Sequence, residues 1–148
     1  MQFVEITEDN FSAAIELRPK RTQYRFARRE TVLYSLGKAY VASRPDEYMP
    51  LLIEYNGKLV GSIRLRNYGH GVGFAAFFID RKHQSKGLGR QAMLHLIDWV
   101  KEHYPKAREI ELAVSPENTV ACHLYESLGF RCTGVKSSDG MVDMELQF

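Results

Sequence analysis

Cysteine and long apolar runs are scarce in this sequence. Two cysteines among 148 residues are too few for a disulfide scaffold and suit a reducing compartment such as the cytoplasm. No stretch reaches the ~18 consecutive apolar residues of a membrane helix, and the first residues show neither the basic start nor the apolar run of a signal peptide. With 20 Lys and Arg against 18 Asp and Glu, the net charge of +2 gives no reason to expect nucleic-acid binding. We therefore expect a cytoplasmic protein that interacts with neither membranes nor nucleic acids.

Linkers, low-complexity tracts and internal repeats are also absent. The composition, 45% hydrophobic and 26% charged, is that of an ordinary globular domain. The length is likewise that of one domain, so we expect residues 1–148 to form a single domain.

Hydrophobic periodicity predicts a mixed α+β fold. Apolar strand patterns predict strands at 3–6, 51–55, 58–65, 73–79, 109–114, 130–135 and 141–146. Helical spacing predicts helices near 11–17, 35–42, 87–102 and 119–128. The resulting order, β-α-α-β-β-β-α-β-α-β-β, predicts a mixed sheet with helices on its faces.

Local signals add detail to these elements. Asn56-Gly57 predicts a tight hairpin, because both residues tolerate positive φ. Thr7 or Asp9 is expected to cap the first helix, and Pro50 to bound the loop before the second strand. Because Arg64 and Arg66 alternate with apolar residues, we expect one face of the third strand to meet water.

The segment 84–90, Gln-Ser-Lys-Gly-Leu-Gly-Arg, opens the longest predicted helix. Glycines at a helix start leave backbone N–H groups accessible, and the helix dipole favours an anion there. Lys86 and Arg90 add positive charge. The segment therefore predicts a cradle for a phosphate or pyrophosphate.

Three interpretations of this loop remain open. It could be a basic loop that only begins a helix. It could belong to a dinucleotide-binding fold, since 87–92 matches G-x-G-x-x-A and Glu109 or Glu111 lies near the position of a ribose-binding acid. Against this, residues 80–86 separate the glycines from the strand, and the chain that follows is too short for a doubly wound sheet. The third interpretation is an acyl-CoA site, since 84–89 reads Q-x-x-G-x-G.

A second motif decides between these interpretations. Residues 118–130 read N-x-x-A-x-x-L-Y-x-x-x-G-F. In this order and spacing, the two motifs resemble those of the GNAT family of N-acetyltransferases. Residues 23–27 and 34–40 are most similar to the bacterial spermine/spermidine acetyltransferase branch.

The resemblance implies a twisted, mostly antiparallel sheet flanked by helices, with acetyl-CoA as co-substrate. The implied acceptor is the primary amine of a small molecule, such as a polyamine or diamine, and the implied assembly is a homodimer. An amino-terminal or antibiotic-amine acetyltransferase on the same fold, and a non-catalytic acyl-CoA-binding module, are the alternatives.

The resemblance also implies roles for individual residues. Tyr125 would protonate the departing thiolate as the general acid, which suits a hydroxyl with a pKa near ~10. Tyr125 also completes an apolar helical stripe with Ala121, Leu124 and Leu128, so a core position is the competing interpretation. The implied cofactor-binding residues are Phe77, Phe78, Ile79, Gln84, Ser85, Lys86, Gly87, Leu88, Gly89, Arg90, Asn118 and Tyr125.

The general base departs from the family pattern. Relatives often place acidic residues where this chain has Ala75, Ala76 and Ala113. Glu111 is the candidate substitute, and Glu54 and Asp80 are weaker ones.

Two further features bear on the chemistry. The basic residues of the segment 18–29 form either a solvated helix face or a site for an acceptor with a carboxylate or phosphate; they are Arg18, Lys20, Arg21, Arg25, Arg28 and Arg29. The five histidines show no metal-ligand spacing, so no metal is expected. Since no nucleophile lies in a catalytic triad pattern, direct transfer from the bound cofactor is expected.

Overall fold

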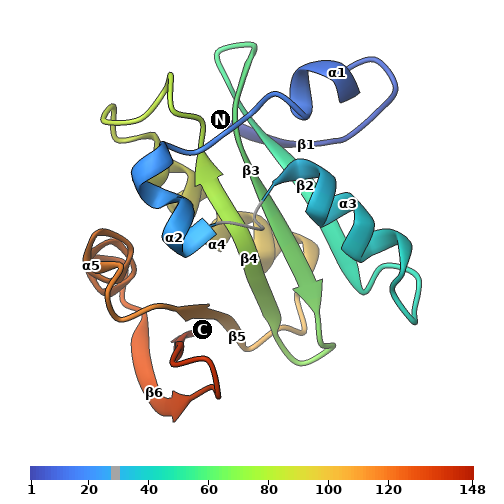
Figure 1. Cartoon of the computed structure of the whole chain (residues 1–148). Coiled ribbons are helices and arrows are strands. Elements are labelled where there is room, and N and C mark those ends of the chain that lie inside the picture. The colour runs from blue at the N-terminus through green and yellow to red at the C-terminus, as the bar shows by residue number, and fades with distance from the viewer. Residues whose placement is uncertain (28–30) are drawn as a thin grey trace.

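The computed structural model describes residues 1–27 and 31–148. Within these ranges, seven strands form one sheet in the order β1-β2-β3-β4-β5-β7-β6 (Figure 1). Neighbouring strands are antiparallel except for β4 and β5, which are parallel. This confirms the predicted mixed α+β fold with a mostly antiparallel sheet.

Every predicted strand is present, with ends shifted by a few residues. The strands are β1 (Gln2–Glu5), β2 (Tyr48–Tyr55), β3 (Lys58–Asn67), β4 (Val72–Ile79), β5 (Glu109–Val114), β6 (Arg131–Lys136) and β7 (Val142–Gln147). The helices in the described ranges are α1 (Phe11–Ala14), the 3-10 helix η1 (Arg21–Gln23), α2 (Tyr24–Ala27), α3 (Val32–Tyr40), α4 (Leu88–His103) and α5 (Thr119–Ser127). None of these helices combines the length and apolar character needed to cross a bilayer.

The N-terminal helices differ from the prediction. The cap of α1 is Asn10, not Thr7 or Asp9, and its Oδ1 accepts from the Thr7 N–H at 2.8 Å, which holds the turn before the helix. Helix α3 begins earlier than predicted because Thr31 Oγ1 accepts from the Tyr34 N–H at 3.1 Å and caps it. Helices η1 and α2 were not predicted, since neither is long enough to show a periodic pattern.

Pro50 lies inside β2, opposite Arg64 of β3, so its predicted place in a loop was wrong. Strand β1 pairs with β2 only from Leu51 to Glu54. Beside Pro50 the β1 side of the strand is therefore an edge, where a missing N–H breaks no ladder hydrogen bond.

The two faces of the sheet are covered by different helices. On one face, the main core packs Leu65, Phe74 and Ile110 against side chains of α4, which Figure 1 shows behind β4. On the other face, Leu52 and Phe78 pack against Ala14, Leu17 and Val32 near α1 and α3.

A bulge in β4 shifts the alternation of its side chains between the two faces of the sheet. Phe74 pairs with Leu65 and Ala75 with Arg64, but Phe78 pairs with Ser62, so one extra residue lies between them. Ala76 takes up that residue with a left-handed φ of 53°. Phe74 and Phe78 therefore lie on opposite faces, although their even spacing predicts one face.

Strands β4 and β5 separate soon after they meet. They pair only at Val72 with Ile110 and at Gly73 with Glu111. From there β4 continues to Ile79, and in the described part of the chain no strand pairs with it on that side. Figure 1 shows the two strands diverging below α2 and beside α5. This divergence opens the sheet at its centre.

Candidate active site

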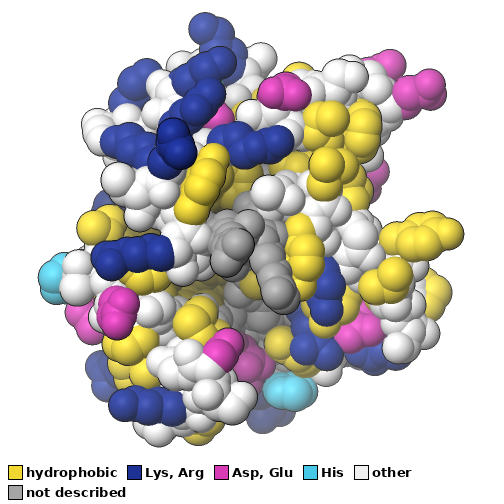
Figure 2. Space-filling view, viewed as in Figure 1, with side chains coloured by type: hydrophobic (Ala, Val, Ile, Leu, Met, Phe, Trp, Pro, Cys, Tyr) yellow, Lys and Arg dark blue, Asp and Glu magenta, His cyan; other side chains and the backbone are white. Residues whose placement is uncertain are grey.

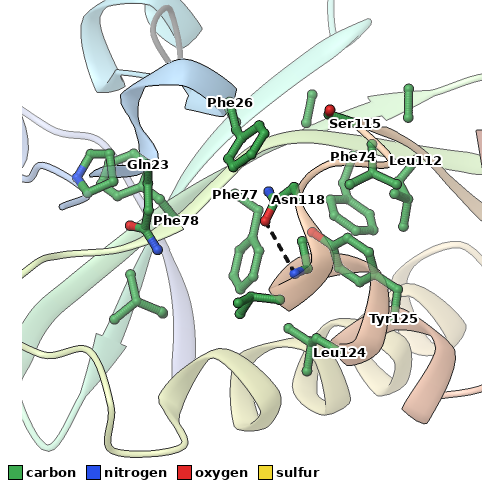
Figure 3. A pocket seen from close by; sticks show the side chains of 18 of the residues that line it. Gln23, Phe26, Phe74, Phe77, Phe78, Leu112, Ser115, Asn118, Leu124 and Tyr125 are labelled. Atoms are coloured by element: carbon green, nitrogen blue, oxygen red, sulfur yellow. Dashed lines mark hydrogen bonds between the residues drawn. The ribbon is translucent and has the colours of Figure 1, made fainter. Parts of the chain in front are cut away.

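A pocket of about 200 Å³ lies where β4 and β5 diverge. Its walls come from β4, from the start of α5 and from the η1–α2 segment (Figure 3). It brings together six of the residues predicted for the cofactor site, namely Phe77, Phe78, Ile79, Gln84, Asn118 and Tyr125. We call it the Tyr125 pocket.

Tyr125 is only 7% exposed, and its ring belongs to the core. The ring packs edge-on against Phe74 at a centroid distance of 5.7 Å and lies 5.8 Å from Phe130. Figure 3 shows its hydroxyl directed into the pocket, on the side of Phe74 and Asn118. The two interpretations of Tyr125 are thus compatible, because the ring is core and the hydroxyl faces the pocket.

Asn118 is the N-cap of α5, directly before its first residue, Thr119. Its Oδ1 accepts from the Ala121 N–H at 3.4 Å, shown as the dashed line in Figure 3. This bond caps the helix with the amide oxygen and leaves the amide nitrogen to donate to a ligand in the pocket.

The glycine loop begins at the edge of this pocket. Gln84 Nε2 donates to the Ile79 carbonyl at 2.7 Å and to Gln23 Oε1 at 2.8 Å, so it ties the loop to β4 and to η1. Ser85 has a φ of 63° and Gly87 a φ of 74°. No side chain caps α4, whose first-turn N–H groups follow Gly87. The residues from Ser85 to Arg90 lie outside the pocket lining, beyond Gln84.

A second cavity of about 450 Å³ adjoins the first. The two share five lining residues, which are Phe74, Ala75, Leu112, Ala113 and Met141. The second cavity also has charged and aromatic side chains, which are Tyr34, Lys38, Tyr48, Arg64, Arg66, Tyr68, Glu111 and Asp143. A ligand in the first pocket could therefore meet a ligand in the second at the small residues Ala75 and Ala113.

Glu111 lines the second cavity and not the Tyr125 pocket. Burial raises the pKa of its carboxyl, and the neighbouring Glu109 raises it further, whereas His70 opposes them. His70 Nε2 lies 3.8 Å from Glu109 Oε1, and possible ligand atoms of His70, Glu109 and Glu111 lie within 4.8 Å of one another. Sequence spacing could not show this grouping, because it depends on the pairing of β4 with β5.

The weaker base candidates line neither cavity. Asp80 is buried and its carboxylate accepts backbone N–H bonds from Arg18 at 2.9 Å and Lys82 at 3.0 Å. Glu54 accepts from the Gln2 side chain, at the β1 edge of the sheet. Asp80 is thus a loop anchor, and Glu54 a surface residue of that edge.

The basic segment also lies outside both cavities, as far as it is described. Arg18 Nη1 donates to the Leu17 carbonyl at 2.8 Å, which is a structural role. Lys20, Arg21 and Arg25 are exposed, and Arg28 and Arg29 lie outside the described residues. Figure 2 shows Lys and Arg side chains gathered on the upper part of this face, where Figure 1 places the loop before α4.

Neither cysteine is placed as a nucleophile. Cys122 is part-buried on α5, and burial raises the pKa of its thiol. Cys132 is exposed on β6, and neither side chain lines a cavity. Because the thiolate is the reactive form, the structure offers no activated cysteine in the described part of the chain.

Sequence reasoning missed several lining residues. Gln23 and Phe26 reach the Tyr125 pocket from the short N-terminal helices, and Met141 from the turn before β7. Lys38, Arg64 and Arg66 line the second cavity, so the face of β3 that was predicted to meet water forms a wall of this cavity. The alternation of arginines with apolar residues in β3 was the sequence pattern that could have indicated this cavity wall.

Comparisons with known proteins found a matching family and similar sequences. The family model described as "Acetyltransferase (GNAT) family" matches residues 3–130. The spermine/spermidine N(1)-acetyltransferase of Bacillus subtilis (strain 168) is 29% identical over 143 residues, covering 91% of this chain and 90% of that protein. The [ribosomal protein bS18]-alanine N-acetyltransferase of Escherichia coli (strain K12) is 28% identical over 93 residues, covering 63% of this chain and 62% of that one.

Solved structures share the fold. A crystal structure of an aminoglycoside acetyltransferase in complex with coenzyme A has a TM-score of 0.77 at 20% identity and covers 98% of this chain and 93% of that one. The spermidine N-acetyltransferase from Vibrio cholerae, in complex with CoA and spermine, has a TM-score of 0.75 at 18% identity, covering 99% and 94%.

Proposed function

The chain belongs to the GNAT acetyltransferase family, and on this premise we propose that it transfers the acetyl group of acetyl-CoA to a primary amine of a small molecule. One observation carries the proposal. Two cavities meet at the divergence of β4 and β5, with the Tyr125 hydroxyl facing one and the Glu111 carboxyl lining the other. A thioester and an amine could approach each other there from opposite sides.

The Tyr125 pocket and the glycine loop fit acetyl-CoA. The pantetheine arm is a narrow chain with two amides. Among the described strands, none pairs with the edge of β4 beyond Gly73, so the backbone there can bond to such a chain. At the start of α4, a Cβ added to Gly87 would meet nothing within 4 Å. The open first turn of α4, together with Lys86 and Arg90, suits the pyrophosphate.

Tyr125 and Glu111 suit the two proton transfers. The amine must be neutral to attack the thioester carbonyl; the new C–N bond forms, the C–S bond breaks, and the sulfur leaves as a thiolate. In our proposal Tyr125 donates its proton to that sulfur, and Glu111 accepts the amine proton directly or through water. The raised pKa of Glu111 makes it a better base than an exposed glutamate.

The geometry favours direct attack in a ternary complex. A covalent acetyl-enzyme would need an activated nucleophile, and the described cavity walls hold no cysteine. The adjoining cavities instead allow both substrates to be bound at once.

The acceptor class is drawn from the relatives. The names of the relatives and neighbours point to spermine, spermidine, aminoglycosides and a protein alanine, all of which offer an amine. A small primary amine fits a cavity of about 450 Å³ better than a folded protein's terminus does. A turnover assay distinguishes this enzyme from the alternative, a non-catalytic acyl-CoA-binding module.

The test is release of free CoA thiol from acetyl-CoA with a panel of small primary amines. We expect thiol release that depends on the amine and saturates with both substrates. If acetyl-CoA binds tightly but no amine gives thiol release, the chain is a binding module and the enzyme proposal fails.

A further inference from the structure

Three cationic side chains surround one aromatic ring in the second cavity. Lys38 Nζ lies 5.3 Å from the centre of the Tyr48 ring, and the guanidinium carbons of Arg64 and Arg66 lie 5.7 and 5.2 Å from it. Arg66 also lies over Tyr68, at 4.9 Å. These cations line the cavity proposed for the acceptor.

This cluster is only partly neutralised. Glu47 Oε1 lies 3.0 Å from Arg66 Nη2. Within residues 1–27 and 31–148, neither Lys38 nor Arg64 makes a salt bridge, and Arg64 Nη1 has only a long contact, 3.4 Å, with Ser35 Oγ. Among the described residues, the cluster therefore holds three positive charges against the one negative charge of Glu47, and an anion would relieve their repulsion.

Strand register places this cluster opposite the acidic side of the cavity. Residues paired across neighbouring strands share a face. Arg66 pairs with Gly73, and Gly73 pairs with Glu111, so these three form one row across β3, β4 and β5. In the next row Arg64 pairs with Ala75, and beyond the gap Ala113 pairs with Asp143.

The floor between the two sides is made of small residues. A Cβ on Gly73 would lie 2.8 Å from a ring carbon of Tyr68, so only glycine allows that ring to lie over the strand. Ala75 and Ala113 line both cavities, at the junction where the amine would meet the thioester. The cavity is thus basic toward β3 and α3, acidic toward β5 and β7, and open between them.

We propose that the acceptor is an amine that also carries an oxyanion, a carboxylate or a phosphate. This inference rests on the proposed acetyl transfer. The amine lies on the Glu111 and Asp143 side, next to the junction with the Tyr125 pocket. The oxyanion lies on the opposite side and accepts hydrogen bonds from Arg64 and Lys38, with Arg66 adding charge. Guanidinium groups bind both carboxylates and phosphates well.

This charge pattern is the opposite of what a polyamine needs. A polyamine would bring a second cation to the side of the cavity that already holds Lys38, Arg64 and Arg66. The resulting repulsion would disfavour it relative to an anionic amine of similar length.

The experiment compares matched acceptors in the thiol-release assay. β-Alanine is matched with propylamine, phosphoethanolamine with ethanolamine, and putrescine serves as the diamine. We expect one anionic amine to exceed its neutral match about tenfold or more in kcat/KM, equal to about 1.4 kcal/mol, and to exceed putrescine. Which anionic amine is preferred distinguishes carboxylate from phosphate.

Arg64→Gln tests the assignment within the protein. We expect it to lower the anionic-to-neutral ratio of kcat/KM about tenfold, mainly through KM. Lys38→Gln, on the part-exposed α3, should lower the same ratio. Arg131→Gln, on the exposed surface of β6 and outside both cavities, is the matched control and should leave the ratio unchanged.

The outcomes separate the two proposals. If putrescine or a neutral amine is preferred to both anionic amines, or if Arg64→Gln and Lys38→Gln leave the ratio unchanged, the anionic acceptor is wrong while acetyl transfer stands. If no amine in the panel gives thiol release although acetyl-CoA binds, acetyl transfer itself is wrong, and the inference falls with it.

Discussion

At the scale of single residues, Tyr125 combines a packed ring with a hydroxyl that faces the pocket, and we propose that this hydroxyl is the general acid. Its ring is held between Phe74 and Phe130, which fixes the direction of the hydroxyl toward the pocket. A phenol O–H can donate a proton to a departing thiolate. Removing only the oxygen therefore separates the two roles.

Tyr125→Phe should lower kcat on the order of a hundredfold or more, because the departing thiolate loses its proton donor. The affinity for CoA and the melting temperature should change little, since the ring contacts remain. Steady-state thiol release and CoA titration measure these effects. Tyr104→Phe, at a half-buried tyrosine outside both cavities, is the control; an unchanged kcat in Tyr125→Phe would leave Tyr125 a core residue only.

Glu111 predicts a pH effect on stability that does not depend on activity. Its pKa is raised in the folded protein, so it favours folding when protonated, and this contribution is lost as pH rises through the folded pKa. Glu111→Gln mimics the protonated form. It should melt above the wild type at about pH 8 and at the same temperature at about pH 4, below the ordinary pKa of glutamate. A lower melting temperature at both pH values would contradict the assigned burial.

The pH dependence of the activity should also reflect the ionisation of Glu111. If Glu111 accepts the amine proton, the wild-type kcat/KM for the amine should fall toward acid with a midpoint above the usual range for glutamate. Glu111→Gln should lose that limb and most of the rate. If Glu111→Gln keeps the wild-type pH profile, then water alone, and not Glu111, accepts the amine proton.

At this scale the sequence singled out the motif residues and Glu111, but it did not predict the cationic side of the second cavity. Asn118 and Tyr125 belong to one short motif on one helix, so their common location follows from local spacing. Lys38, Arg64 and Glu111 come together only through the register of β3, β4 and β5 and the packing of α3. No local pattern contains that information.

At the scale of elements, the start of α4 is the feature that the cofactor proposal depends on. Gly87 needs its φ of 74°, a conformation that costs most residues about 1 kcal/mol or more. Gly89 is within the first turn, where an added Cβ would have only an ordinary contact, 3.9 Å from Ile79 Cγ1. A side chain at 89 is therefore tolerated by the fold but would cover the backbone.

Gly89→Leu should weaken CoA binding about tenfold or more while the melting temperature of the free protein stays close to that of the wild type. Isothermal titration with CoA and thermal melting measure the two effects. Gly37→Leu, at a helical glycine of α3 with open space around it, is the matched control and should bind CoA normally. Unchanged CoA affinity in Gly89→Leu would move the pyrophosphate away from this helix.

Among the elements, long periodic segments were predicted well and the bulge was not. Helix α4 and strands β3 and β5 show clear periodicity over their whole lengths. The bulge at Ala76 looks locally like an ordinary apolar strand, and only the opposite faces of Phe74 and Phe78 in the fold reveal it. Helices as short as η1 and α2 lack a periodic signal.

At the scale of the whole molecule, the small net charge of +2 conceals separate charged regions. Exposed cations gather near the loop before α4 (Figure 2), and a second cationic cluster lines the second cavity, where we propose that the acceptor binds. The motif of the glycine loop predicted the first cationic region. The second region forms only when α3 and β3 are packed together. The predicted homodimer and cytoplasmic location stay predictions.

Ligand binding should stabilise the whole fold, because the Tyr125 pocket joins β4, α5 and the N-terminal segment. CoA at about a hundred times its Kd should raise the free energy of unfolding by about 2.7 kcal/mol. Thermal melting with increasing CoA measures this as a continuing rise in melting temperature. A melting temperature that does not respond to CoA would contradict the site.

The most direct test of the central claim follows the acetyl group itself by mass spectrometry. The protein is incubated first with acetyl-CoA alone and then with an accepted amine. We predict that the protein gains no acetyl group in the first step, and that one acetylated amine appears for each free CoA thiol in the second. An acetylated protein before amine is added, or thiol release without acetylated amine, would contradict direct acetyl transfer between the two cavities.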